Sequence, residues 1–408
     1  LTAQVFNKFF TSWDPDVMVD THTSNGADYS YTMTLIHTQP DKLGGELGGF
    51  LRDTMLPAMY EQMAARGWPT CPYVNPVKDS PDHGIADFLE TARFSTGYAA
   101  LHHTIGFMPE THMLKPFKDR YDSMRALVET ALDFTVKNAA QIQALRRAAK
   151  EAGRTRAEWP IHWAMDEQNP GSFRFKGYEA GYKPSVLGDY SRLYYDRSKP
   201  WERDIAWYNR FNADITVPAP KAYVIPQAWR EAIERLELNG VNMERVAEDR
   251  MDEVGYYHIV SVASRPNAYE GHMFHDDVQL EQRRGQVLLR AGDVIVPLDQ
   301  DKARYVVETL EPLAHDSFFR WGFFNSVLEK KEAYSDYVFE DEAERLLSEE
   351  PELAAKFDDQ YWAEKDEAHE FPREFYDAFA EGGWLGITTP EEYGGHGYGI
   401  TEASILLE

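Results

Sequence analysis

Two residues in the first third of the chain could do chemistry together. His22 follows the short apolar run 17–19, and Glu110 follows a second apolar run, 105–108. Each residue therefore sits just past the end of a predicted strand, and open α/β sheets bind ligands beyond the carboxyl ends of their strands. A neutral imidazole can bind zinc, and a glutamate can act as general base on a metal-bound water. Taken one residue at a time, hydrogen bonding by the histidine and solvation or capping by the glutamate are the more common roles at such positions.

The elements that must position these residues alternate between strands and helices over 1–155. Leucine and methionine recur every fourth residue over 43–63, which predicts one helix with a core stripe. An apolar stripe over 117–132 predicts a second, long helix that ends near Gly153. Three basic side chains near that end suit the helix dipole: Arg146, Arg147 and Lys150. This alternation predicts an α/β sheet with helices on both faces.

The chain changes character twice after this region. Residues 156 to about 225 are rich in Trp, Tyr, Pro and Arg and show little periodicity. Beyond 220, a helix is predicted over 228–238. Strands are predicted on either side of it, at 222–225, 254–264, 285–289 and 294–298. We therefore expect a smaller β-rich domain over 156–357. Residues 340–408 hold 4 basic and 20 acidic side chains, and such a shift marks a separate module or a solvated arm.

The composition excludes several classes of protein. The net charge of −26 argues against nucleic-acid or anionic-membrane partners, and no apolar run approaches the roughly 20 residues of a membrane span. The single cysteine, Cys71, excludes an internal disulfide framework and a cysteine-based metal cage, and it leaves the compartment open. The chain begins at Leu1 and stops at Glu408 inside a helix-like stretch, so we expect both ends to be truncated.

Other histidine and cysteine patterns are weaker candidates. His272 and His275 have a spacing that chelates zinc from a helix, but the strand signals around them predict opposite faces. His112 shares a face with Glu110 if the strand continues, and it either tunes the base or packs beside it. Cys71 has no identifiable activating neighbour and is predicted to be a buried small residue.

Two stretches carry a resemblance to a known family. Residues 19–33, VDTHTSNGADYSYTM, resemble the segment of zinc metallocarboxypeptidases, the carboxypeptidase A superfamily, that carries the third zinc ligand. Residues 93–120 look like the segment that carries the catalytic glutamate, in the right order and with a helix between. The likeness covers residues 1–155 and continues more loosely to about 357, where 321–340 is similar to the end of a bacterial branch.

The resemblance implies an α/β fold with part of the zinc-carboxypeptidase sheet and flanking helices, followed by the smaller β-rich domain and a helical C-terminal tail. It implies zinc-assisted hydrolysis of a C-terminal peptide bond or a related amide. By that likeness His22 matches the zinc-binding histidine and Glu110 the general base. The pocket for the last side chain of the substrate is assigned to three residues on the loop before the glutamate strand: Ser95, Thr96 and Gly97.

The chain departs from this family in its metal ligands. The family takes its first two zinc ligands from a His-x-x-Glu motif upstream of the third, and none of the 13 histidines here is followed by glutamate at that spacing. A catalytic zinc needs about three protein ligands, so the site is incomplete and we expect the 408 residues alone to be inactive. A non-catalytic binding module is therefore a second interpretation.

The end of the chain resembles a different family. Residues 369–408 resemble the N-terminal helices of acyl-CoA dehydrogenases, in which a helix ending in Gly-Trp precedes an Ile-x-x-Pro-Glu-x-Tyr-Gly-Gly turn. In that family the flavin site and the catalytic base come from later sequence, so we expect no productive FAD binding. We expect a join of two truncated genes, with a helical module over 358–408. A fragment of a flavin-dependent dehydrogenase is the third interpretation.

Overall fold

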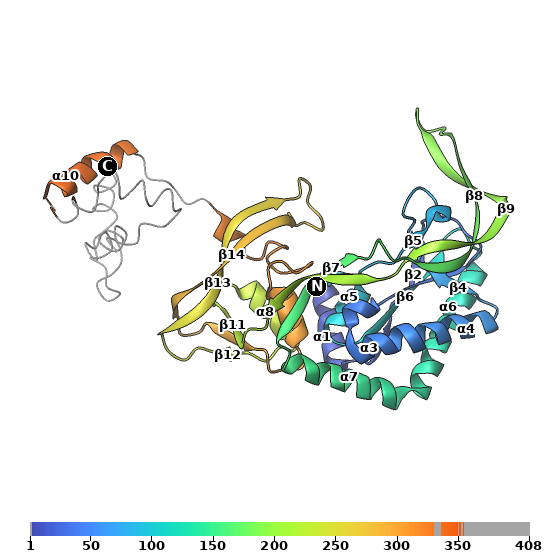
Figure 1. Ribbon diagram of the computed structural model, residues 1–408, viewed down its shortest axis with the longest axis horizontal. Coiled ribbons are helices and arrows are strands. Elements are labelled where there is room, and N and C mark those ends of the chain that lie inside the picture. Colours follow the sequence, from blue (N-terminus) through green and yellow to red (C-terminus); the bar gives the residue numbers. More distant parts are fainter. Residues whose placement is uncertain (1, 330–335, 350, 352–353, 355–408) are drawn as a thin grey trace. The chain divides into compact units, whose positions relative to one another are not determined.

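A computed structural model describes residues 2–329, 336–349, 351 and 354 (Figure 1). The chain divides into two compact units, Leu1–Asn325 and Ser326–Glu408. The helix described in the second unit is α10 (Asp336–Glu349). The tail predicted over 358–408 lies outside the described residues. Within the described part, no helix combines the length and apolarity needed to cross a membrane.

A mixed five-stranded sheet in the first unit positions the residues of interest. Its strands are β1 (Val17–Val19), β2 (His22–Ser24), β3 (Met33–His37), β4 (Thr70–Pro72) and β6 (Ile105–His112). The central strand β6 pairs in parallel with β1 and β2 and antiparallel with β3, which pairs in parallel with β4. Every residue of β6 is buried, as expected for a strand covered on both faces. The predicted mixture of α and β structure is confirmed.

Helices cover both faces of this sheet. One face packs against α3 (Gly45–Phe50), α4 (Leu56–Ala65), α6 (Phe117–Lys137) and α7 (Ala139–Arg154). Ile105 and Phe107 of β6 point into that core. The intervening Gly106 faces α5 (Ser95–Leu101), because a Cβ at this glycine would lie 3.0 Å from the Cα of Thr96.

Both long helices predicted from periodicity are interrupted. The first begins as α2 (Pro40–Leu43), breaks at Gly44, where φ is +72°, and contains a π-helical turn, η1 (Leu51–Met55), between α3 and α4. Gly44 tolerates this left-handed conformation because it has no Cβ. The second breaks at Asn138, whose side-chain amide donates a hydrogen bond to the carbonyl of Phe134 and ends α6.

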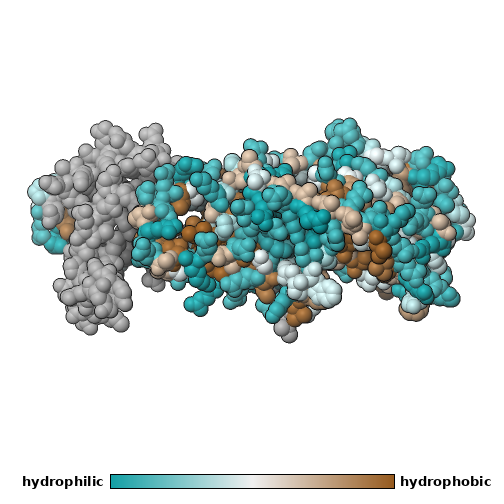
Figure 2. Space-filling model, turned by 90° about the horizontal axis from the view of Figure 1, so that it is seen from below, coloured by the Kyte–Doolittle hydropathy of each residue, from teal (hydrophilic) through white to brown (hydrophobic). Residues whose placement is uncertain are grey.

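The apolar stripe of α6 does not face the core. Phe117 and Leu132, both in the predicted stripe, are 74% and 59% exposed. The buried face instead combines four small residues with two large ones: Ser123, Ala126, Thr130 and Ala131, with Leu127 and Phe134. Ser123 and Thr130 can be buried because their hydroxyls donate to helix carbonyls one turn back. The face drawn in Figure 2 is mostly hydrophilic, with its hydrophobic residues gathered in separate patches.

Antiparallel strands dominate from 158 onward, as the β-rich prediction requires. Three pairings form long or regular ladders: β7 (Glu158–Met165) with β10 (Phe211–Pro218), β8 (Gly171–Pro184) with β9 (Ser191–Tyr208), and β13 (Arg250–Ser264) with β14 (His275–Leu289). A further sheet joins β11 (Ala222–Ile225), β15 (Val294–Pro297) and β12 (Glu244–Arg245). The strands β8 and β9 lie in the stretch judged to lack periodicity, but the first half of β8 does alternate: Phe175 is buried, Phe173 is half-buried and Arg174 between them is exposed.

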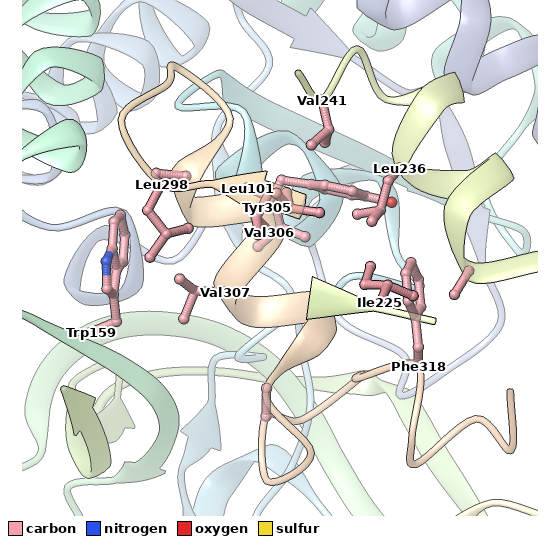
Figure 3. Close-up of a cluster of buried hydrophobic side chains, with 14 of the residues drawn as sticks. Leu101, Trp159, Ile225, Leu236, Val241, Leu298, Tyr305, Val306, Val307 and Phe318 are labelled. Carbon is pink, nitrogen blue, oxygen red and sulfur yellow. The ribbon is translucent and has the colours of Figure 1, made fainter. Parts of the chain in front are cut away.

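A second core joins α5 to the strands and helices that follow residue 156. Figure 3 shows Leu101 of α5 among Trp159 of β7, Leu236 of α8 (Arg230–Leu238) and Val306 of α9 (Ala303–Leu310). The same cluster includes Phe10 of α1 (Thr2–Trp13). Because α5 is packed from both sides, its first turn is held rigidly over the sheet. The domain boundaries at 155 and 357 stay predictions.

A buried arginine ties α7 to the start of the chain. Arg146 was expected in a last helical turn, but α7 continues to Arg154 and places this guanidinium inside the protein. It donates to the carbonyls of His103 (3.1 Å) and His102 (3.2 Å) and pairs with Asp14. His102 and His103 are themselves buried at the turn between α5 and β6.

This network predicts a loss of stability in acid. Burial raises the pKa of Asp14, but hydrogen bonds from Lys150 and Arg146 outweigh it and lower that pKa from 3.8 to about 2. Because the folded value lies below the unfolded one, the stabilisation is complete above about pH 4 and is lost as the pH falls through about 2. We expect wild type and Asp14→Asn to converge over that window, by on the order of 1 kcal/mol for this partly exposed group.

Urea unfolding at a series of pH values measures the effect. The matched control is Asp189→Asn, in the exposed turn between β8 and β9, which should track the wild type at every pH. A constant gap between wild type and Asp14→Asn from pH 6 to pH 2 would contradict the role given to Asp14.

Candidate functional site

The pairing of β2 with β6 brings the two predicted chemical residues together. The strands run in parallel, and His22 is the register partner of Glu110. Partners in register present their side chains on the same face of a sheet. One detail of the prediction is wrong: Glu110 does not follow the end of its strand but lies inside β6, which continues to His112. The proline at 109 does not end the strand, because β6 continues to pair with β2 and β3 beyond it.

The two side chains differ sharply in their contact with water. The His22 side chain is 44% exposed, whereas Glu110 is 9% exposed. Burial raises the pKa of Glu110, the interaction with His22 lowers it, and the charge of Asp20 raises it again. The net direction is upward, so the carboxylate is a stronger base than an exposed glutamate.

Asp20 orients the imidazole. Its Oδ2 lies 3.0 Å from Nε2 of His22, so this nitrogen is the donor and Nδ1 carries the free lone pair. A carboxylate behind a histidine in this way fixes the tautomer that a metal ligand needs. Among the residues that the structure describes, no group of three or more His, Cys, Asp or Glu side chains could hold a metal ion. His22 is therefore a single donor within this part of the chain.

The three residues assigned to the substrate pocket form the first turn of α5. They were expected on a loop, but Ser95, Thr96 and Gly97 are helical. A Cβ at Gly97 would lie 2.1 Å from the carbonyl oxygen of Thr91 and 2.5 Å from that of Glu90. Only glycine allows so close an approach. The first turn of α5 therefore packs directly against the backbone of Glu90 and Thr91.

That segment contains an acidic residue that sequence reasoning missed. Glu90 is 8% exposed, and its Oε2 accepts a hydrogen bond of 3.2 Å from the hydroxyl of Thr96. Burial raises the pKa of Glu90 to about 7, against the opposing influences of Thr96 and Lys42. The charges of Glu110 and His22 also act on it, so the three groups belong to one electrostatic neighbourhood. Glu90 lies just before the stretch that carries the family resemblance, and no motif singles it out.

The remaining histidine candidates have structural partners. His275 contacts Ser264 through Nδ1 (2.8 Å) and Asn325 through Nε2 (2.8 Å), while Nδ1 of His272 lies 3.1 Å from the carbonyl oxygen of Trp321. Because His272 and His275 bond to different partners, they share no position for a metal ion. This agrees with the prediction that the two side chains lie on opposite faces.

His112 and Cys71 are packed residues. His112 shares the face of Glu110, accepts a hydrogen bond from the backbone N–H of Leu114 and stacks edge-on against Tyr29. Burial lowers the pKa of His112. Cys71 is fully buried in β4, and burial raises the pKa of its thiol, which makes the thiol inert.

Comparisons with known proteins give two kinds of match. Carboxypeptidase 2 of Trichophyton tonsurans and of Trichophyton equinum are each 29% identical to it over 119 residues, which is 29% of this chain and 22% of each relative. A probable carboxypeptidase 2 of Arthroderma benhamiae is 28% identical over 113 residues, 28% of this chain and 21% of the relative. The chain thus spans about a fifth of the length of these relatives. The similarity supports a peptidase-like kind of protein at most.

The second match lies at the end of the chain. The family described as acyl-CoA dehydrogenase, N-terminal domain, matches residues 340–408. No solved structure matches the chain. The resemblances to a carboxypeptidase and to an acyl-CoA dehydrogenase N-terminal segment are therefore both supported in part.

The site geometry predicts how Glu110 titrates. In the metal-free protein, Asp20→Asn should lower the pKa of Glu110, because it removes a negative charge, and His22→Gln should raise it, because it removes a favourable interaction. NMR titration of labelled glutamate carboxyl carbons measures both shifts. Asp53→Asn, an exposed aspartate of η1, is the control and should leave the titration of Glu110 unchanged. Identical titrations in all variants would mean that the three groups do not share a site.

Proposed function

We propose that the chain carries the general-base part of a zinc-carboxypeptidase-like site, which hydrolyses a C-terminal peptide bond or a related amide. The observation that supports this most is the register pairing of His22 with Glu110, which sets a buried carboxyl beside an imidazole open to solvent. The similarity to carboxypeptidase 2 proteins supports the same kind of activity. A peptide or amide is the proposed substrate.

Glu110 would perform the proton transfers of this reaction. Its carboxylate accepts a proton from a water molecule while the water oxygen forms a bond to the carbonyl carbon of the substrate. The same proton then passes to the nitrogen of the leaving amine as the carbon–nitrogen bond breaks, which returns Glu110 to its starting state. Burial suits Glu110 to both steps, because a raised pKa strengthens the base and keeps its conjugate acid able to donate.

Zinc fits the described residues only in part. His22, with Asp20 behind it, has the arrangement of one metal ligand and its orienting carboxylate. A catalytic zinc takes about three protein ligands, and the described residues do not group three around His22. We therefore derive no step through the metal, and zinc enters the proposal by resemblance alone.

A second function is favoured by the match over residues 340–408. We infer that this segment derives from a flavin-dependent acyl-CoA dehydrogenase, of which it corresponds to an N-terminal portion. Visible flavin absorbance on the purified chain would favour the dehydrogenase as the main activity. A colourless protein would leave the peptidase-like site as the function to test.

The central prediction concerns Glu110. In the protein as its host produces it, with bound metal retained, Glu110→Gln should lower kcat/KM for blocked dipeptides by about 10²- to 10⁴-fold, because it removes the proton acceptor. The amide is nearly isosteric, so the melting temperature should change little. Glu61→Gln, an exposed glutamate of α4, is the matched control and should keep full activity.

Three results separate the interpretations. Loss of activity in Glu110→Gln alone supports the peptidase-like site. Equal activity in both variants removes Glu110 from the mechanism. Binding of peptides without hydrolysis by the wild type favours the non-catalytic binding module.

A further inference from the structure

The base of the β13–β14 hairpin (Figure 1) joins a serine, a histidine and an asparagine through hydrogen bonds. Oγ of Ser264, the last residue of β13, lies 2.8 Å from Nδ1 of His275, the first residue of β14. Nε2 of His275 lies 2.8 Å from Oδ1 of Asn325, which begins the short helix η3 (Asn325–Leu328). A hydroxyl bonded to a base that a third group orients is the arrangement used in nucleophilic catalysis.

A β-bulge brings the serine and the histidine together. The ladder pairs Ala263 with Asp277 and then Ser264 with His275, so its register shifts by one residue at this point. Without the shift, Ser264 would face Asp276. Bulges re-aim side chains, and they are over-represented next to active sites. The register shift therefore gives Ser264 an imidazole as its partner in place of a carboxylate.

Asn325 determines which nitrogen of the imidazole carries the proton. The amide oxygen of Asn325 only accepts hydrogen bonds, so Nε2 of His275 donates to it. Nδ1 then has the free lone pair and accepts a hydrogen bond from the hydroxyl of Ser264. A base needs this tautomer in order to take the proton of the serine. Gly322 makes room for the amide, because a Cβ at this glycine would lie 2.8 Å from Nδ2 of Asn325.

The histidine is buried, whereas the serine is exposed to solvent. His275 is 4% exposed, and the centroid of the buried Phe319 ring lies 5.5 Å from that of the imidazole. Packing of this kind holds the imidazole in one orientation. Ser264 belongs to the exposed part of β13. A substrate can therefore approach Ser264 from the solvent while the base stays fixed beside it.

We propose that Ser264, His275 and Asn325 form a second catalytic site, which hydrolyses uncharged carboxylic esters. Ser264 is the nucleophile, His275 is the general base, and Asn325 is a positioning residue that acts through His275. The two charged residues next to the serine and the histidine, Arg265 and Asp276, form an ion pair at 2.7 Å and neutralise each other. An uncharged ester therefore fits this surface better than a charged one. The inference is independent of the proposed peptidase-like site.

The reaction consists of two displacements. Oγ of Ser264 forms a bond to the carbonyl carbon of the ester while its proton passes to Nδ1 of His275. The bond between that carbon and the leaving alcohol breaks, and the alcohol takes the proton, which leaves an acylated serine. Water then adds to the acyl carbon and gives a proton to Nδ1, and this proton returns to Oγ as the carboxylic acid leaves. The ester and one water molecule are the only reactants.

A fluorophosphonate probe tests the nucleophile directly. An activated serine oxygen forms a bond to the phosphorus of the probe as fluoride leaves, and peptide mapping by mass spectrometry identifies the labelled residue. In the full chain we expect the label at Ser264 and its loss in Ser264→Ala. The matched control is Ser261→Ala, an exposed serine of the same strand, which should be labelled like the wild type. Absence of label at Ser264 would overturn the proposal.

Hydrolysis of p-nitrophenyl acetate tests the other two residues. His275→Gln should lower the rate by about 10²-fold, because it removes the base. Asn325→Leu should also lower the rate, whereas Asn325→Asp should retain most of it, because a carboxylate accepts the same hydrogen bond from Nε2. Asn325 is exposed, so this pair of variants decides the question even if His275→Gln does not fold. Equal rates in Asn325→Leu and Asn325→Asp would contradict the positioning role.

A chelator separates this site from the proposed function. With 1,10-phenanthroline present, hydrolysis of blocked dipeptides by a zinc-dependent site should stop, whereas labelling of Ser264 and hydrolysis of the ester should continue. Ester hydrolysis that stops with the chelator and persists in Ser264→Ala belongs to the peptidase-like site and rejects the second site. Ester hydrolysis that resists the chelator and is lost in Ser264→Ala supports the second site, whether or not dipeptides are hydrolysed.

Discussion

The parallel register of β2 against β6 is the constraint on which the site depends. It makes His22 and Glu110 direct neighbours on one face of the sheet. Side chains alternate along a strand, so a slip of one residue would send Glu110 to the opposite face, into the apolar core that holds Phe107. That core is densely filled by β3, α4 and α6, and burying a carboxyl there would cost several kcal/mol. Core packing on one face therefore fixes the chemistry on the other.

The helix α5 turns this register into a site with distinct environments. Gly106 lets α5 lie close against β6, and Leu101 anchors the far end of the helix in the core of Figure 3. The cover helps to exclude water from Glu90, which accepts a hydrogen bond from Thr96, while His22, at the start of the short strand β2, stays open to solvent. Burial raises the pKa of both Glu90 and Glu110, while the imidazole of His22 is exposed, so the site combines two protected carboxyls with one open nitrogen donor.

Much of the fold could be predicted from local signals, and the failures have physical causes. The runs 17–19 and 105–108 identified two strands because buried strands read as short apolar stretches. The stripe that begins at Phe117 identified α6 but assigned the wrong face. The helix packs through smaller residues such as Ala126 and Ala131, which permit close approach, and periodicity alone cannot distinguish two faces of similar apolarity. The strands β8 and β9 were missed although one face contributes Phe175 and Ile205 to a buried cluster, because this buried part is short compared with the exposed remainder of each strand.

The candidate site was predictable only where a residue ends or follows a strand. His22 met that condition because it follows β1, whereas Glu110 was found because it follows a short apolar run, although its strand continues to His112. Their adjacency required only that β2 and β6 pair in parallel. Glu90 did not meet it, because it belongs to a connection whose exposure no local pattern reports. Its burial depends on Gly97, seven residues later, where a side chain of any size would push α5 away and open the carboxyl to water. The environment of an acidic group in such a connection is thus set by the helix that covers it, and it becomes visible only when that helix has been placed.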